Sequence, residues 1–293
     1  MRNTRRLSLP VHWIMLAPAL VILVGFMIYP AINAVYLSFT STNLLNLKAQ
    51  TFIGLDNFAR MVADPVFYAA LVNSLWWTFG AVFFQLVFGM IGALLLNQRI
   101  KLRGLIRGLV LLPWATPSVL IALMWMWILD PNLGIANRLF EAIGLGAQPW
   151  LSDTTTALPT LIFIDVWFGI PFFAVMILAA LQSVPYELVE AARIDGANAW
   201  NTFWRVVLPL ILPAVMITTT LRLIWTANFF DLILILTNGG PANASLTVPL
   251  DAYQTAYRGM NFGLGAALAV AQAAVLAILV VFYMRQIRKS DIA

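Results

Sequence analysis

Residues 158–181 read LPTLIFIDVWFGIPFFAVMILAAL, and Asp165 is the one charged side chain among these positions. A helix needs about 20 mostly apolar residues to cross the hydrocarbon core of a bilayer, which is about 30 Å thick. The stretch therefore predicts a membrane-spanning helix. Five further runs of the same kind lie on either side of it, at 13–37, 71–96, 106–129, 209–236 and 263–284. We expect an all-α membrane protein with six transmembrane helices.

The composition excludes several classes of protein. Of the 293 residues, 62% are hydrophobic and 10% are charged, whereas about 25% of the residues of a soluble domain are charged. The absence of cysteine excludes disulfides and thiol catalysis, and a single histidine, His12, argues against a histidine-based metal site. No lysine follows a glycine, so the Gly-Lys-Ser/Thr phosphate loop is missing and the chain is not itself an ATPase.

The distribution of positive charge predicts the orientation in the membrane. Cytoplasmic loops carry an excess of Lys and Arg, and four basic residues lie in the loops assigned to the other side, Lys48, Arg60, Arg138 and Arg258. Both termini are therefore predicted to be cytoplasmic, and the net charge of +5 needs no nucleic-acid partner. Twelve of the seventeen basic residues lie at the ends that would share the cytoplasmic side: Arg2, Arg5, Arg6, Arg99, Lys101, Arg103, Arg107, Arg193, Arg205, Arg285, Arg288 and Lys289.

The chain contains no long or Gly/Ser-rich linker, so we expect a single transmembrane domain over residues 1–293. Residues 52–69 are either a short helix at the outer membrane interface or an ordered loop. Tryptophans near span ends ordinarily anchor a helix at the interface. This role is predicted for Trp76, Trp77, Trp125 and Trp127.

The 183–209 segment between the fourth and fifth spans is polar enough to leave the membrane. Ser183 is predicted to cap a helix with Pro185 in its first turn. Asp195-Gly196 is expected to end that helix, because glycine readily adopts the left-handed conformation there, and Asn198 is expected to cap a second helix. The result is a cytoplasmic helix-turn-helix, which physical reasoning alone leaves open between a rigid connector and a docking element.

The same segment carries a longer motif. The run Glu190-Ala191-Ala192-x3-Gly196-x9-Val206-x-Leu208-Pro209 resembles the EAA loop of ABC-importer permeases, with Val206 where that family has isoleucine. Other stretches resemble its carbohydrate branch, the maltose-type permeases. They are Leu112-Pro113-Trp114-x2-Pro117-Ser118, Pro149-Trp150-Leu151-Ser152-Asp153, Leu236-Thr237-Asn238-Gly239-Gly240-Pro241 and Asn261-Phe262-Gly263-x-Gly265-Ala266-Ala267.

The resemblance implies the type I ABC-importer permease architecture in the inner (plasma) membrane, as a multi-pass subunit of a binding-protein-dependent transport system. It implies a second, similar permease, two cytosolic ATPase subunits that bind ATP and Mg²⁺, and a periplasmic or lipid-anchored substrate-binding protein. This subunit itself would hold no cofactor and would be no enzyme. ATPase coupling would fall to Glu187, Glu190, Ala191, Ala192, Asp195 and Gly196.

Three charged residues, Asp165, Arg222 and Asp231, lie inside predicted spans. Each costs roughly 2.5–3.5 kcal/mol at a helix centre on insertion scales, so they should face protein or water. Helical spacing gives two faces that combine a charge with aromatic rings, which suits a sugar. One face comprises Asp165, Phe168, Gly169 and Phe172, and the other comprises Arg222, Trp225, Thr226 and Phe229.

The resemblance implies that sugar contacts fall at Trp114, Asp165, Phe168, Gly169, Phe172, Arg222, Trp225 and Thr226. Charges at Asp165 and Arg222 replace neutral polar groups of the maltose-type pattern, which puts maltose itself in doubt. Alternatively, these two residues pair only with each other, although helix rise places them roughly 10 and 20 Å below the outer ends of their spans. Asp231, about 180° around the helix from Arg222, is expected to hold a structural or interface role, with Asn228 as its partner.

These observations predict a permease subunit that imports a mono- or oligosaccharide delivered by a binding protein. One alternative substrate is a sugar alcohol or an anionic sugar derivative, which Arg222 would suit. An alternative from another class is a secondary transporter or channel that is driven by ions through Asp165 and Asp231.

Overall fold

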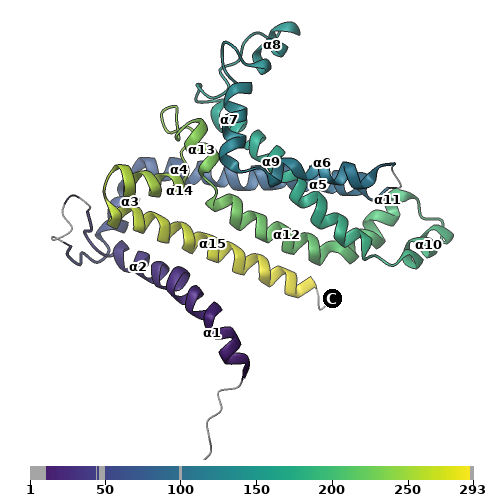
Figure 1. The fold of residues 1–293 in the computed structure, drawn as a ribbon, viewed down its shortest axis with the longest axis horizontal. Helices are drawn as coiled ribbons and strands as arrows, with labels where there is room; N and C mark the ends of the chain where they lie inside the picture. The colour runs from purple at the N-terminus through teal and green to yellow at the C-terminus, as the bar shows by residue number, and fades with distance from the viewer. Residues whose placement is uncertain (1–10, 44, 46–49, 99–100, 291–293) are drawn as a thin grey trace, which may run out of the picture. The chain divides into compact units, whose positions relative to one another are not determined.

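The computed structural model describes residues 11–43, 45, 50–98 and 101–290 (Figure 1). These residues are helical apart from loops and two isolated β-bridges, Thr40–Phe52 and Asn43–Asn261. The chain divides into two compact units, one formed by residues up to 63 with 252–271 and the other by 64–251 with the residues from 272 onward. Each unit is described by itself.

Five helical stretches are long and apolar enough to cross a membrane, and they confirm five of the predicted spans. They are Met15–Ser38, Pro65–Leu96, Ala157–Gln182, Ala199–Leu236 and Phe262–Val281. Their elements are α1 (Val11–Leu23), α2 (Tyr29–Ser38), α4 (Pro65–Leu75), α5 (Ala81–Leu96), α9 (Ala157–Gln182), α11 (Ala199–Thr202), α12 (Leu208–Asn228), α13 (Asp231–Leu236) and α15 (Phe262–Ser290).

The predicted continuous third span is wrong in its shape. Residues 106–129 form two helices, α6 (Arg103–Ala115) and α7 (Ser118–Ile128), which are bent by 91° at the break between them. Proline disfavours a helical conformation in the residue before it, and Thr116, which precedes Pro117, is extended with ψ 136°. Figure 1 shows α7 turning away from α6, so this stretch is a broken span or a re-entrant loop.

The fifth span also breaks, after Asn228. Phe229 is extended with ψ 104°, and α13 begins at Asp231. The helical-wheel argument that placed Asp231 opposite Arg222 is therefore wrong, because no continuous helix joins the two residues. The predicted partner is wrong as well: Asn228 Nδ2 donates to the carbonyl of Ile224, and the Asp231 carboxylate accepts a 3.3 Å hydrogen bond from Ser118.

Helix α9 forms the core of the larger unit and packs against α5, α6 and α12. Its inward side chains include Leu161, Ile164 and Phe173, none of which is exposed. The approach to α5 is close at Gly89, where a Cβ would overlap the Cβ of Phe173. Small residues allow membrane helices to approach closely in this way. Close packing then stabilises the contact between helices, because lipid surroundings supply no hydrophobic driving force for it.

In the smaller unit, α3 (Asp56–Ala63) is tied to the end of α2. Asn57 is buried, and its Nδ2 donates 2.9 Å hydrogen bonds to the carbonyls of Ser38 and Thr40. A short helix therefore exists within the predicted 52–69 stretch, whereas residues 65–69 already belong to the long helix that begins with α4.

The predicted interfacial tryptophans divide into exposed and packed side chains. Trp76 and Trp127 are 66% and 73% exposed, in accord with lipid-facing anchors. Trp77 is 1% exposed, and its indole N–H donates to the carbonyl of Thr226 at 2.9 Å, so its assignment as an anchor is wrong. Trp125 packs edge-on against the ring of Phe163.

Candidate functional site

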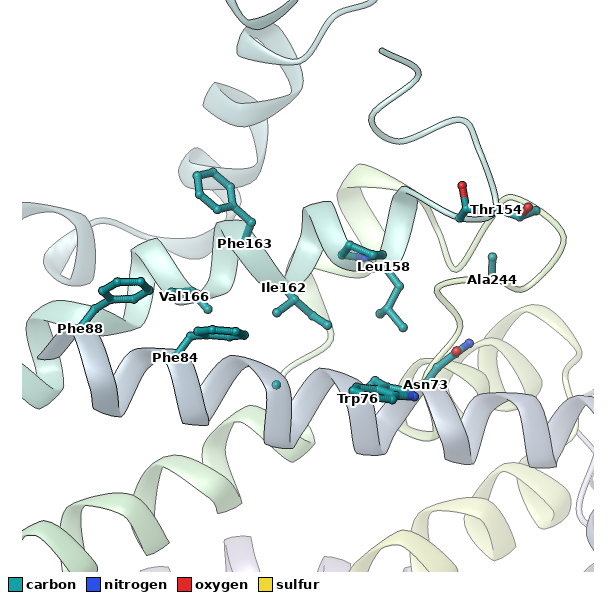
Figure 2. A pocket seen from close by; sticks show the side chains of 13 residues that line it. Asn73, Trp76, Phe84, Phe88, Thr154, Leu158, Ile162, Phe163, Val166 and Ala244 are labelled. Atoms are coloured by element: carbon teal, nitrogen blue, oxygen red, sulfur yellow. The ribbon is translucent and has the colours of Figure 1, made fainter. Parts of the chain in front are cut away.

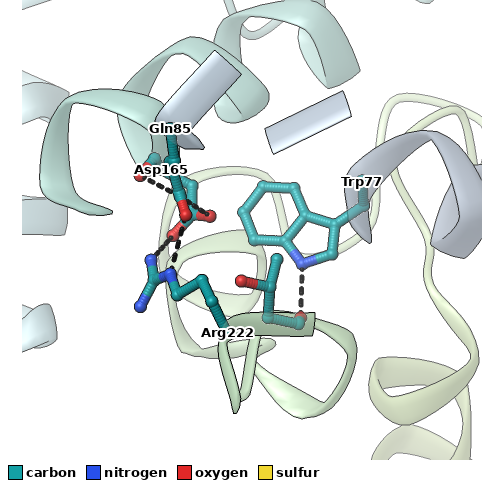
Figure 3. Close-up of polar contacts among 5 residues, drawn as sticks. Trp77, Gln85, Asp165 and Arg222 are labelled. Atoms are coloured by element: carbon teal, nitrogen blue, oxygen red, sulfur yellow. Dashed lines mark hydrogen bonds and ion pairs between the residues drawn. The ribbon is translucent and has the colours of Figure 1, made fainter. Parts of the chain in front are cut away.

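Three long helices each contribute one polar side chain to a buried cluster: Gln85 from α5, Asp165 from α9 and Arg222 from α12 (Figure 3). Gln85 and Asp165 have no exposed surface, and Arg222 is 4% exposed. The Nη2 of Arg222 lies 3.3 Å from Oδ1 of Asp165, which makes an ion pair inside the unit. The predicted pairing of these two charges is therefore present.

Gln85 completes the hydrogen bonding of both charges. Its Nε2 donates to Oδ2 and to the backbone carbonyl of Asp165, each at 2.8 Å, and its Oε1 accepts from Nε of Arg222 at 2.7 Å. A buried ion pair is tolerated when further hydrogen bonds satisfy its remaining atoms, because desolvation otherwise outweighs the Coulomb attraction. The cluster is thus a compensated group without net charge.

Gly169 lies beside this cluster because no larger residue fits there. A Cβ on Gly169 would lie 2.6 Å from Nη2 of Arg222 and would overlap the amide of Gln85. The glycine therefore makes room for the two side chains from α5 and α12 to reach α9. This is a steric requirement, which differs from the sugar contact that the resemblance implied for this position.

Aromatic rings flank the cluster. The guanidinium carbon of Arg222 lies 5.9 Å from the centroid of the Phe168 ring, which stacks on Phe229 at 5.9 Å. Phe172 contacts Trp225 at 5.2 Å and Trp114 at 5.8 Å between centroids. Trp225 and Trp114 are 46% and 41% exposed, whereas Phe172 is 7% exposed. Two accessible tryptophan faces thus lie over a buried phenylalanine.

The estimated depths of Asp165 and Arg222 are corrected by the break in the fifth span. Because α12 ends at Asn228, Arg222 lies six residues from the end of its helix, about 9 Å at 1.5 Å per residue. Asp165 lies eight residues from the start of α9, about 12 Å by the same rise. The two estimates differ by about 3 Å, so most of the gap expected for an unbroken span disappears.

Thr226 differs from the other predicted site residues in the state of its side chain. It is 1% exposed, and its hydroxyl oxygen is buried without a hydrogen-bond partner in the part of the chain that the structure describes. Gln85 was missed by the sequence reasoning. The available signal was a long amide side chain in the middle of the apolar 71–96 run. Polar residues inside a membrane carry a free-energy cost and are usually functional.

Two hollows of the larger unit lie elsewhere. One of about 700 Å³ is bordered by Trp76, Phe84, Phe88, Ile162 and Phe163 (Figure 2). Another, of about 620 Å³, is lined largely by residues of α7, α8 (Ile135–Ala142) and α9. None of the predicted substrate-binding residues lines either hollow.

The 183–209 segment forms the predicted helix-turn-helix with a different first cap. Helix α10 (Tyr186–Ile194) begins after Pro185, whereas Ser183 ends α9 and its hydroxyl donates to the carbonyl of Ala180 at 2.8 Å. The expectation that Ser183 caps α10 was wrong, because Ser183 instead lies at the end of α9. Asn198 caps α11 as predicted, accepting from the N–H of Asn201 at 2.9 Å.

The turn between α10 and α11 uses the left-handed conformation expected of Gly196, whose φ is +84°. The N–H of Ala197 donates to the carbonyl of Ala192 at 2.9 Å, which closes the end of α10. Helix α10 has no buried residue. Its exposed residues include Glu187, Glu190, Ala191 and, at the turn, Asp195 and Gly196, while Ala192 is partly buried.

A set of membrane-length helices around a buried charge cluster, with an exposed helical hairpin between two of them, defines a polytopic membrane protein. The chain belongs to the family described as binding-protein-dependent transport system inner membrane component, whose model matches residues 85–290. It is therefore a multi-pass inner-membrane permease and not an enzyme. Five of its helical stretches have the length and composition of membrane spans.

Curated relatives extend the match over most of the chain. The trehalose/maltose transport system permease protein MalF of Thermococcus litoralis is 31% identical over 88% of this chain and 87% of its own length. The sulfoquinovosyl glycerol transport system permease protein SmoG of Agrobacterium fabrum is 31% identical over 95% and 90%. The trehalose transport system permease protein SugA of Mycobacterium tuberculosis is 31% identical over 88% and 82%.

A solved structure shares the fold. A bacterial ABC transporter involved in the import of the acidic polysaccharide alginate contains a chain that matches with a TM-score of 0.83, at 24% identity and over 95% of each chain. The same transporter, in complex with an alginate pentasaccharide-bound periplasmic protein, matches with a TM-score of 0.82 at 23% identity.

Proposed function

We propose that the chain is a permease subunit of an ATP-driven importer that moves a mono- or oligosaccharide delivered by a binding protein. The observation that carries the proposal is the pair of accessible rings, Trp114 and Trp225, beside the buried Arg222 cluster in a chain of this family. Tryptophan faces cover the apolar C–H face of a sugar ring, while nearby polar groups hold its hydroxyls. Relatives named for trehalose, maltose and starch products support the sugar class.

The state of Arg222 favours a neutral sugar over an anionic derivative. Its charge is already compensated by Asp165 at 3.3 Å, and its Nε is bound to Gln85 at 2.7 Å. An anionic substrate would have to compete with a buried carboxylate for the same guanidinium. A sugar alcohol lacks the ring face that would stack on Trp114 or Trp225.

Ion coupling through Asp165 and Asp231 is not favoured. Asp165 is held by Gln85 and Arg222, and Asp231 accepts a hydrogen bond from Ser118. The family depends on a binding protein, which is the mark of an importer assembled from several subunits.

The exposed hairpin supports a role in ATPase coupling. Helix α10 presents Glu187, Glu190 and Ala191 to solvent and has no buried residue. We assign it, together with Ala192, Asp195 and Gly196, to docking on one of two cytosolic ATPase subunits, which would bind ATP and Mg²⁺. A second, similar permease completes the pathway, and a periplasmic or lipid-anchored protein delivers the sugar.

The test is uptake into proteoliposomes that contain the complete complex, with maltose, trehalose, sulfoquinovosyl glycerol and glucuronic acid as labelled probes. Uptake of a neutral sugar is expected, and it should require both ATP and the binding protein. Uptake driven by an ion gradient without ATP would contradict the proposal, as would the absence of ATP-dependent uptake for the whole panel.

The substrate role of Arg222 is tested by Arg222→Gln, and by Arg222→Gln with Asp165→Asn so that no buried charge is left unpaired. Both variants are expected to raise KM for uptake at least tenfold, because each removes a charged donor from the path. Arg138→Gln, which removes an exposed charge from α8, is the control. Unchanged KM in the double variant would contradict substrate contact at Arg222.

A further inference from the structure

The amide of Gln85 joins three membrane-spanning helices at one point. Gln85 comes from α5, and its partners Asp165 and Arg222 come from α9 and α12. All three side chains are at least 95% buried. The Gln85 side chain therefore does more than fill space, because its donor and its acceptor are each used by one of the two charges.

The bonds of Arg222 determine which part of its guanidinium remains available. Nε is bound to Oε1 of Gln85, and Nη2 is bound to Oδ1 of Asp165 (Figure 3). Nη1 has no hydrogen bond within the described residues. Both partners lie on the same side of the guanidinium, which has five donors in a fixed planar fork. Binding of Nε and Nη2 therefore sets the direction in which Nη1 points.

We propose that Gln85 is a positioning residue for substrate recognition: it orients Arg222 so that the Nη1 end of the guanidinium is presented to the sugar, as a hydrogen-bond donor for a neutral hydroxyl. The inference rests on the proposed function of the Arg222 site. Gln85 acts through Arg222 and does not touch the substrate. Gly169 supports this arrangement, because a Cβ there would occupy the place of the Gln85 amide.

The test compares two buried glutamines. Gln85→Met keeps the approximate length of the side chain and removes all three of its hydrogen bonds. Gln272→Met is the matched control, because Gln272 is 7% exposed and its Nε2 donates to the carbonyl of Ala227 at 3.2 Å, away from the cluster. Each variant is measured in the complete complex for KM and Vmax with the sugar probes named above, and for thermal stability in detergent.

Gln85→Met is expected to raise KM about tenfold, because this is the usual cost of losing one hydrogen bond to a charged group. Gln272→Met is expected to lower thermal stability and to leave KM unchanged. In the Arg222→Gln background, Gln85→Met should add no further rise, because residues that act through one another are not additive. KM does not depend on the amount of folded complex. If Gln85→Met fails to assemble, Gln85→Asn, which is one methylene shorter, is expected to raise KM as well.

Two results would overturn the inference. One is a wild-type KM in Gln85→Met or Gln85→Asn, with loss of stability alone. The other is an additive rise in KM in the Arg222→Gln background. Failure of the proposed function is distinguishable, because the wild-type complex itself would then show no ATP-dependent uptake.

Discussion

At the scale of single residues, the molecule depends on a hydrogen-bond network that tolerates little change. Gln85, Asp165 and Arg222 satisfy one another inside a unit where an unpaired charge would be costly. Such a network gains its value from completeness, because a half-satisfied polar group in an apolar interior is more harmful than none. Gly169 is the residue on which the space for this network depends.

Gly169→Ala is therefore expected to destabilise the permease by about 1–3 kcal/mol, the usual cost of overpacking a filled core. It should also raise KM for uptake, since the new methyl group would displace Gln85 and Arg222. Thermal unfolding in detergent and initial rates of uptake measure the two effects. Gly108→Ala in α6 is the control, because nothing lies within 4 Å of a Cβ there. Equal behaviour of the two variants would contradict the steric argument.

At the scale of elements, two breaks in predicted helices shape the site. The bend of 91° between α6 and α7 follows from Pro117, and the break after Asn228 places Arg222 at a depth similar to that of Asp165. The exposed α10 hairpin depends on a third local feature. Gly196 has φ +84°, and nothing lies within 4 Å of the position of a Cβ. A substitution there acts through the backbone alone.

Gly196→Val is expected to distort the turn after α10, because an L-residue in the left-handed region costs roughly 1–2 kcal/mol and branching at Cβ makes it harder. Uptake per ATP hydrolysed should fall severalfold, while the complex still assembles. Gly196→Asn is the matched control, since asparagine tolerates this conformation. Simultaneous measurement of ATPase rate and uptake in proteoliposomes checks the prediction, and normal coupling in Gly196→Val would contradict it.

At the scale of the whole molecule, orientation in the membrane rests on the distribution of basic residues. Twelve of seventeen lie at the ends assigned to the cytoplasm. Such an excess is what the positive-inside rule uses to orient a chain. The loops assigned to the other side, by contrast, carry turn residues such as Asp130. The pKa of Asp130 is held below its ordinary value by hydrogen bonds from the backbone N–H groups of Leu133 and Asn132.

The orientation is tested by single cysteines, for which the cysteine-free chain provides a clean background. A membrane-impermeant maleimide should label Ser152→Cys, in an outer loop, on intact cells. It should label Ser290→Cys, near the C-terminus, only after the cells have been lysed. The unsubstituted chain should remain unlabelled in both conditions. Labelling of Ser290→Cys on intact cells would reverse the predicted topology.

Much of the coupling hairpin could be predicted from local sequence, because its features depend on neighbours in the chain. Gly196 ends α10, and Asn198 caps α11 through a hydrogen bond three residues away. Ser183 was misassigned because it lies between two helices and could belong to either. The longer α9 extends as far as Ser183, whose hydroxyl donates to the carbonyl of Ala180. Trp77 was misassigned because its position near a span end does not reveal which way its ring points.

The sequence by itself determined the membrane class, five of the spans and the presence of charges inside them, since each is a property of composition, length or position along the chain. The family followed from the resemblance of its motifs, and the pairing of Asp165 with Arg222 stayed one of two alternatives. The tertiary structure alone decided that Gln85 bridges Asp165 and Arg222, that Gly169 is needed for space, and that the third and fifth spans break. Those features depend on where side chains from α5, α9 and α12 meet. Contacts between helices that are 57 to 137 residues apart leave no trace in local periodicity.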